Sequence, residues 1–280
     1  MRISVFRMKM MRIALGCVLV FFITLFVSCG TSGNSDRKAE PAFAHGEIIH
    51  SSFGNCDTTS NSGVSLEISV WTPSDSSNAA AAISNILARK SIQRINSYLD
   101  STTLASIPSA SVSVEESFRL FQKNYKEFKS DFPDAPGCWQ VELKGDTVMT
   151  TAKVLQYKLD HYAFTGGAHP NSFRSFHIFD LTSGEETDIK KFVTDSVSLL
   201  KLVDKYFRKT ESLAPGADLE KAGYFLLNNQ FFIPSNYALT REGVLFYYNP
   251  YEIAPYARGV IQFVIPYSEL ENVIDKKVFF

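Results

Sequence analysis

Residues 157–181 constrain the fold more than any other passage of this sequence. Residues 157–164 and 173–181 are both rich in aromatic residues, which is typical of strands. Between them, Gly166 and Gly167 supply backbone angles that other residues adopt only at a cost. The passage therefore predicts two successive strands joined by a glycine-bearing loop, and hence a β-sheet at the centre of the chain.

Apolar residues that alternate with polar ones predict further strands on both sides of this passage. The first two of these strands flank a long turn-rich loop and are expected to form a hairpin. Tight turns are expected at residues 144–146 and 182–184. The predicted strands cover residues 46–53, 64–71, 139–143, 147–164, 236–240, 244–248 and 259–266.

Other segments repeat apolar residues at three- and four-residue steps, which indicates amphipathic helices. These segments are residues 83–99, 113–128 and 195–209, and a short helix is also expected at 219–227. Ser113 and Glu116 have the spacing of a capping box at the start of the second helix. Strands and helices are segregated along the chain without a βαβ rhythm. The expected class is α+β, with antiparallel sheets, packed helices and two closely associated modules.

The N-terminus has the features of an export signal. A basic stretch precedes an apolar run at residues 13–27, which is shorter than the about 20 residues of a transmembrane helix. The run ends in a small residue followed by Cys29, which is typical of a lipobox. We expect residues 1–28 to be removed and Cys29 to be diacylated, with residues 29–45 as a flexible tether. The alternative is an ordinary secretory signal with a chance cysteine.

The exported part of the chain is mildly acidic and carries two cysteines. Without residues 1–28 it has 24 Lys and Arg against 29 Asp and Glu, a net charge of −5. No basic run interleaves with aromatic residues, so no nucleic-acid partner is expected. Cys56 and Cys138 are expected to form a disulfide in an oxidising compartment, with two buried free thiols as the alternative. Such a bond would stabilise the fold by about 4–5 kcal/mol in the chain-entropy model.

Three histidines, His161, His169 and His177, follow one another at steps of eight residues and raise the question of zinc. No HExxH motif is present, and the glycine break changes which way these side chains face. We therefore expect no metal and no cofactor. His161 is expected to be a hydrogen-bonded histidine within a sheet, and His169 to fix the glycine loop.

The tyrosine-rich passage at residues 247–256 is the best candidate for binding, because exposed tyrosines offer a large contact area with a polar tip. The alternative is that its tyrosines fill the core and that Glu252 pairs with Arg258. The candidate ligand-binding residues from this passage and from the glycine loop are Tyr251, Glu252, Tyr256, Arg258, Thr165, His169 and Asn171.

No catalytic residue is expected. The sequence has no Gly-x-Ser-x-Gly elbow, and its serine, histidine and acidic residues show no recognisable spacing. A glycosidase that uses a pair of carboxylates remains an alternative, because the spacing of two residues in the sequence says little about their distance in the fold.

Three passages together resemble one bacterial family: residues 162–171, residues 179–185, and residues 238–259 followed by 264–267. They are similar to the paired domains of unknown function in the ectodomain of the lysozyme-sensing anti-sigma-V factor. The same pair precedes the catalytic domain of some peptidoglycan deacetylases and occurs alone in lipoproteins of Gram-negative gut bacteria. The resemblance implies a deacetylase-accessory module at residues 46–160 and an anti-sigma-V ectodomain module at residues 161–275.

The resemblance further implies a stand-alone binding module outside the cytoplasm. The 280 residues contain no second hydrophobic span, no sigma-binding segment and no deacetylase domain. The implied ligand is a lysozyme-like protein or a peptidoglycan-derived glycan. The expected location is the cell envelope, anchored by lipid in the outer membrane and facing the periplasm or the cell surface. The alternatives are an envelope hydrolase or deacetylase that uses His161, His169 or nearby carboxylates, and a structural lipoprotein without a small ligand.

Overall fold

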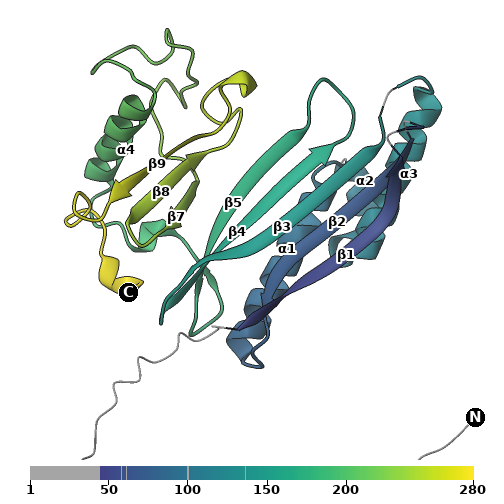
Figure 1. Ribbon diagram of the computed structural model, residues 1–280, viewed down its shortest axis with the longest axis horizontal. Coiled ribbons are helices and arrows are strands. Elements are labelled where there is room, and N and C mark those ends of the chain that lie inside the picture. The colour runs from purple at the N-terminus through teal and green to yellow at the C-terminus, as the bar shows by residue number, and fades with distance from the viewer. Residues whose placement is uncertain (1–44, 58, 61, 100, 136) are drawn as a thin grey trace, which may run out of the picture. The chain divides into compact units, whose positions relative to one another are not determined.

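The computed structural model describes residues 45–57, 59–60, 62–99, 101–135 and 137–280 (Figure 1). The expected signal peptide, Cys29 and the tether up to residue 44 lie outside the described residues. Within the part that is described, no helix combines the length and the apolar character that a membrane span requires.

In the described residues, six strands form one sheet in the order β1–β2–β3–β4–β5–β6, called here the large sheet. Its neighbouring strands are antiparallel except for β2 and β3, which are parallel. The strands are β1 (Gly46–Asp57), β2 (Ser62–Pro73), β3 (Trp139–Thr150), β4 (Val154–Phe164), β5 (Asn171–Asp180) and β6 (Glu186–Thr187).

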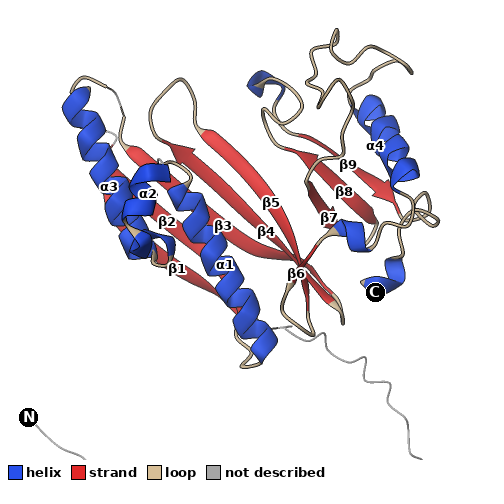
Figure 2. Cartoon of the chain, turned by 180° about the vertical axis from the view of Figure 1, so that it is seen from behind, coloured by secondary structure: helices blue, strands red, loops and turns tan. Residues whose placement is uncertain are grey.

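The connection between β2 and β3 carries the helices of this half of the chain. They lie together on one face of the large sheet, which Figure 2 shows from the helical side. They are α1 (Asn78–Asn96), α2 (Ser101–Ser106), the 3-10 turn η1 (Pro108–Ser111) and α3 (Val114–Asp131).

The α+β class is confirmed, but the expectation of purely antiparallel sheets is wrong at β2 and β3. Apolar residues alternate in the same way in either strand direction, so periodicity could not reveal the orientation. A parallel pair needs a crossover of at least a dozen residues, which the helical connection supplies.

The helix caps show why these segments begin where they do. The Ser77 hydroxyl accepts a hydrogen bond from Ala80 N at 3.2 Å and starts α1. The Ser113 hydroxyl accepts one from Glu116 N at 3.3 Å and starts α3. The predicted capping box is realised in part, because the Glu116 carboxylate pairs with Arg119.

The first hydrophobic core lies between α1, α3 and the large sheet. Alternate residues of β2, β3 and β4 face the helices, while the residues between them face the opposite side. The predicted disulfide between Cys56 and Cys138 is confirmed, with Cα atoms 5.5 Å apart, and it joins the end of β1 to the start of β3. Fully buried members of this core include Leu66, Ile83, Ile95, Phe121, Val141, Leu143, Leu155, Tyr157 and Phe179.

The turn predicted at residues 144–146 is wrong. Strand β3 continues to Thr150, and the chain turns at residues 151–153, where the Thr151 hydroxyl accepts from Val154 N at 3.0 Å. Gly145 lies within β3, at a position where Tyr157 on the neighbouring strand leaves no room for a side chain. A Cβ at this position would collide with the Tyr157 hydroxyl.

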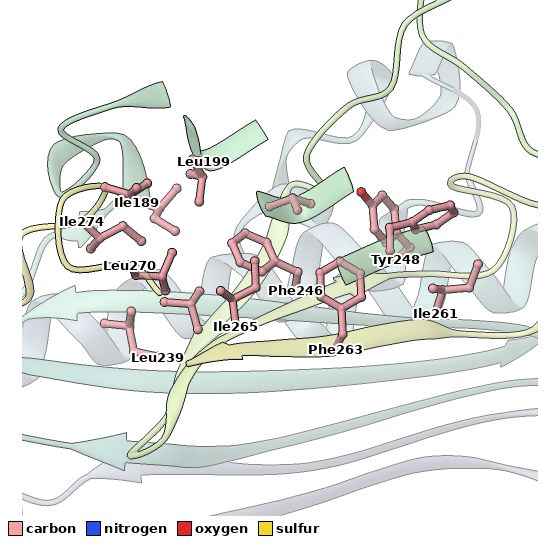
Figure 3. Packing of buried hydrophobic residues seen from close by; sticks show 14 of the residues in the cluster. Ile189, Leu199, Leu239, Phe246, Tyr248, Ile261, Phe263, Ile265, Leu270 and Ile274 are labelled. Atoms are coloured by element: carbon pink, nitrogen blue, oxygen red, sulfur yellow. The ribbon is translucent and has the colours of Figure 1, made fainter. Parts of the chain in front are cut away.

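In the described residues, the C-terminal half forms a three-stranded antiparallel sheet in the order β7–β8–β9, called here the small sheet. Helix α4 packs against it and is capped at its start by Asp195, whose carboxylate accepts from Ser198 N at 3.0 Å. Figure 3 shows the packed side chains, among them Phe246, Phe263 and Ile265. The elements are η2 (Ile189–Lys191), α4 (Ser196–Thr210), β7 (Asn236–Leu239), β8 (Gly243–Tyr248), η3 (Tyr256–Arg258), β9 (Ile261–Pro266) and η4 (Lys276–Val278).

The structure differs from the sequence predictions at two further places. Residues 219–227 form no helix: residues 219–223 form turns, in which Gly223 adopts φ 92°, and Phe225 N donates to Ile253 O at 2.8 Å. The module boundary expected between residues 160 and 161 falls inside β4, and the large sheet continues to Thr187.

Candidate functional site

Two buried amide side chains connect the large sheet to the C-terminal half. Asn249, which follows β8, accepts from Arg174 N at 2.7 Å and donates to Arg174 O at 2.9 Å. It therefore pairs with the edge of β5 as another strand would. Gln156 on β4 donates to His177 O and accepts from Leu239 N on β7, both at 3.0 Å. We call Asn249 and Gln156 the amide joint.

A groove of about 450 Å³ lies beside the amide joint. One wall is the face of β3, β4 and β5 that points away from the helices, and the other is the segment 247–260 after β8. The volume falls in the range of about 300–1,000 Å³ that is usual for small-molecule sites. The residues used below are Glu142, Lys144, Asp160, Tyr162, Arg174 and Tyr247.

Charged residues in the groove wall are paired with one another. Arg174 binds both carboxylate oxygens of Asp160, with Nη2 at 3.0 Å from Oδ2. The Asp160 hydrogen bond is the main reason that the pKa of Arg174 is raised. Lys144 Nζ lies 3.0 Å from a Glu142 oxygen. Both carboxylates therefore face the groove as anchored hydrogen-bond acceptors.

Tyrosines add flat apolar surface to the same walls. The Arg174 guanidinium lies 5.4 Å from the centre of the Tyr247 ring, within cation–π range. The Tyr162 hydroxyl accepts from Gln140 Nε2 at 3.3 Å, which orients its ring in the wall. The groove thus combines aromatic faces with charged and amide groups.

Three of the candidate residues from the sequence come together at one place. The His169 ring stacks on Tyr256 with centroids 3.8 Å apart, and its Nε2 lies 3.1 Å from the Tyr251 hydroxyl. These three residues, called here the aromatic rim, join the glycine loop to the segment 249–259. Tyr251 is 56% exposed and has φ 68°, a strained angle for a residue with a side chain. It directly follows Pro250, which lines the groove.

The other candidate residues are not part of this cluster. Glu252 accepts from Asn249 N at 2.9 Å and so holds the amide joint in place, and burial raises its pKa. The pairing of Glu252 with Arg258 is wrong, since Arg258 binds Glu211 and donates to the Tyr224 hydroxyl at 2.8 Å. Thr165 is half-buried at the end of β4, and Asn171 is exposed at the start of β5.

The evenly spaced histidines do not meet. His161 is buried, and its Nε2 lies 3.2 Å from the Tyr98 hydroxyl, in agreement with the expected sheet histidine. His169 lies in the aromatic rim. His177 has its Nδ1 at 2.6 Å from Glu186 Oε1 and its Nε2 at 2.9 Å from the Ser175 hydroxyl. Among the described residues, no three His, Cys, Asp or Glu side chains gather as metal ligands.

The groove residues on β3 and β4 were not among the candidate residues from the sequence, although the sequence carries a signal for them. Glu142, Lys144 and Asp160 alternate with core residues such as Leu143 and Leu159, so their positions place them on one face. The sequence could not show that the segment 247–260 lies across that face, because the amide joint is formed between residues far apart in the chain.

Comparison with known families accounts for most of the described chain. Residues 61–172 match the family model described as Deacetylase PdaC. Residues 183–268 match the family described as a protein of unknown function, DUF3298. The chain carries a PdaC-type domain followed by a DUF3298 domain. This order confirms the pairing that the resemblance implied, and the two domains indicate a module related to the cell envelope.

Solved structures with a DUF3298 domain share the fold of the whole pair. A protein from Bacteroides fragilis has a TM-score of 0.64 at 19% identity, over 85% of this chain and 96% of its own. A protein from Pseudomonas aeruginosa has a TM-score of 0.59 at 20% identity, over 86% of this chain and 97% of its own. At these identities the likeness establishes the fold alone.

Curated relatives match only in part. The immunogenic proteins MPB64 of Mycobacterium bovis and MPT64 of Mycobacterium tuberculosis are 27% identical over 123 residues. The match covers 40% of this chain and 49% of theirs, so the chain spans about half the length of these relatives.

Acid should destabilise the PdaC-type domain through His161. Burial, together with the charge of Arg94, lowers the pKa of His161 to about 4, whereas the unfolded side chain titrates near its ordinary value of 6.5. The neutral ring therefore stabilises the fold above pH 6.5, and this contribution is lost as the pH falls towards 4. At pH 4.5 the loss amounts to roughly 2–3 kcal/mol. The free energy of unfolding, measured with urea at pH 7 and at pH 4.5, tests this loss of stability.

In this experiment His161→Gln should flatten the pH dependence, and the matched variant His50→Gln, at an exposed position on β1, should leave it unchanged. His177, whose pKa burial also lowers, contributes to the slope that remains. Equal slopes for wild type and His161→Gln would show that His161 does not carry this effect.

Proposed function

We propose that this chain is a non-catalytic binding module of the cell envelope, held at a membrane by an acylated Cys29. Its ligand is a peptidoglycan-derived glycan bound in the groove between β3–β5 and the segment 247–260. The observation that carries the proposal is the chemistry of the groove walls, which combine tyrosine rings with anchored carboxylates and a guanidinium.

Sugars present hydroxyl groups beside apolar C–H faces, and the groove offers a partner for each. Tyr162 and Tyr247 supply flat apolar surface with polar tips. Asp160 and Glu142 are held in place by Arg174 and Lys144, so their free lone pairs can accept hydrogen bonds from hydroxyl groups. Polar groups that are already oriented lose little freedom on binding, which favours affinity.

A lysozyme-like protein is the other ligand that the resemblance implied. A stable protein interface buries about 800 Å² on each partner. The groove is instead a recess whose volume suits a small ligand. A glycan fragment fills such a recess directly, whereas a folded protein would have to insert a loop. The glycan is therefore the better match to this site.

A soluble peptidoglycan fragment should bind the full chain in calorimetric titration. Glu142→Gln should weaken binding by about tenfold, because a hydrogen bond to a charged acceptor is worth roughly 1.5–3 kcal/mol. Glu127→Gln makes the same change at an exposed position on α3 and should have no effect. Capture of a lysozyme-like protein with no affinity for the fragment would replace the glycan by the protein as ligand. Binding of neither ligand would remove the proposal.

One arrangement favours a second candidate function, an envelope hydrolase. Ser175, His177 and Glu186 are linked in the order of a serine-hydrolase triad, with hydrogen bonds of 2.9 and 2.6 Å. Burial lowers the pKa of His177, so its ring is neutral at pH 7 and able to accept a proton. Ser175 Oγ would attack an acyl carbonyl, and His177 Nε2 would pass the proton to the leaving group before water releases the acid.

Two features rank this candidate second. Ser175 is only 5% exposed and lies within β5, away from any sharp turn that would present it to a substrate. Glu186 is also bound by Lys90 Nζ at 2.8 Å. Burial alone would raise the pKa of Glu186, but the hydrogen bonds from His177 and Lys90 outweigh it and lower the pKa to about 2.

A fluorophosphonate probe tests the hydrolase directly. If Ser175 is a nucleophile, the wild-type protein should gain one adduct by mass spectrometry, and Ser175→Ala should gain none. Ser183→Ala, at the turn after β5, is the control and should react like the wild type. An unmodified wild-type protein would exclude this candidate.

A further inference from the structure

We infer that the PdaC-type domain contains an anion site centred on Arg94, which binds a carboxylate group. The site is a pocket of about 200 Å³ between α1 and the large sheet. It is separate from the aromatic rim and is called here the Arg94 pocket. Its lining residues are Lys90, Gln93 and Arg94 of α1, Leu159 of β4, and Ser175 and His177 of β5.

Among the described residues, the guanidinium of Arg94 has no anionic partner. It is half-buried, and among the described residues no Asp or Glu forms an ion pair with it and no acceptor forms a hydrogen bond with its side chain. A charge withdrawn from water without a partner is costly, so proteins rarely retain one without a role. Burial lowers the pKa of Arg94, as expected for a cation in this position.

The charges of the ionisable residues next to Arg94 cancel one another, so the positive charge of Arg94 is not neutralised. The Glu186 carboxylate binds Lys90 at 2.8 Å and accepts from the ring of His177 at 2.6 Å. The other nitrogen of His177 is paired with the Ser175 hydroxyl. Lys90 and Glu186 thus cancel, and the neutral ring adds no charge. The cluster therefore carries one net positive charge, located on Arg94.

The geometry of Arg94 leaves its donors free for a planar acceptor. Its Cζ lies over the Phe173 ring, 4.2 Å from the ring centre, which is within cation–π range. The N–H groups lie in the guanidinium plane, in the fork that binds a carboxylate through two hydrogen bonds. None of the described residues that line the Arg94 pocket is acidic, so none of them repels an anion.

A second pocket of about 460 Å³ shares Arg94, Ser175 and His177 with the first and continues towards β7. Its lining includes Glu186 and Asp188, so this wider pocket disfavours anions. The ligand is therefore a molecule with its carboxylate in the Arg94 pocket and any larger, uncharged part in the wider space. The carboxylate can belong to a sugar acid or to a free small acid.

Calorimetric titration of the full chain in detergent distinguishes these sources. The probes are N-acetylmuramic acid and D-lactate, with N-acetylglucosamine and D-lactamide as their neutral counterparts. At least one acid should bind, and its neutral counterpart should bind about tenfold more weakly or worse. Binding of D-lactate indicates a free small acid, and binding of N-acetylmuramic acid alone indicates a sugar acid. The choice of the sugar acid as a probe rests on the proposed function, whereas the choice of D-lactate does not depend on it.

Arg94→Gln should weaken binding of the acid by about tenfold or more, and Arg94→Lys, which keeps the charge, should weaken it less. Arg89→Gln removes the same charge from an exposed position on α1 and should leave binding unchanged. If neither acid binds, or if Arg94→Gln binds as the wild type does, the site is disproved. A loss caused by Glu142→Gln alone would then still support the groove.

Discussion

The pairing of the Asn249 amide with the backbone of Arg174 is the interaction on which the rest of the structure depends. It provides hydrogen-bond partners for the N–H and C=O groups of Arg174 at the edge of β5, which would otherwise be left unpaired. The Gln156 side chain likewise pairs with the His177 carbonyl on β5 and with the Leu239 N–H group on β7. A buried polar group left without a partner costs roughly 1–3 kcal/mol, so these amides specify one way of docking the DUF3298 domain on the large sheet.

The groove and the aromatic rim both follow from that docking. The wall formed by β3–β5 is fixed by the first core, and the segment 247–260 is fixed by Asn249, which Glu252 holds through its backbone nitrogen. The strained φ of Tyr251 and its contact with His169 lie next to this joint. The unpaired charge of Arg94 lies on the other face of the same strands, where the helices cover the large sheet.

Much of the fold could be predicted from the sequence because local patterns decide it. The Ser77 and Ser113 caps, the alternation in β4 and the pairing of Cys56 with Cys138 all have signals in neighbouring residues or in simple chemistry. The features that the sequence did not predict depend on contacts between residues that are far apart in the chain. The Tyr157 hydroxyl fits over Gly145, β2 runs parallel to β3, and Arg174 meets Asn249, which lies 75 residues away in sequence. The three residues of the aromatic rim were all among the candidate ligand-binding residues from the sequence, whereas the charged groove residues of β3, β4 and β5 were not.

Calorimetric unfolding of Asn249→Ala tests the role of the amide joint most directly. The wild type should unfold in one cooperative transition, because the two domains share buried polar contacts. In Asn249→Ala, the DUF3298 domain should unfold first and at a lower temperature, with a loss of about 2–4 kcal/mol for the two backbone groups left unpaired. Asn171→Ala, at an exposed position, should unfold like the wild type. Identical unfolding of Asn249→Ala and wild type would contradict the account.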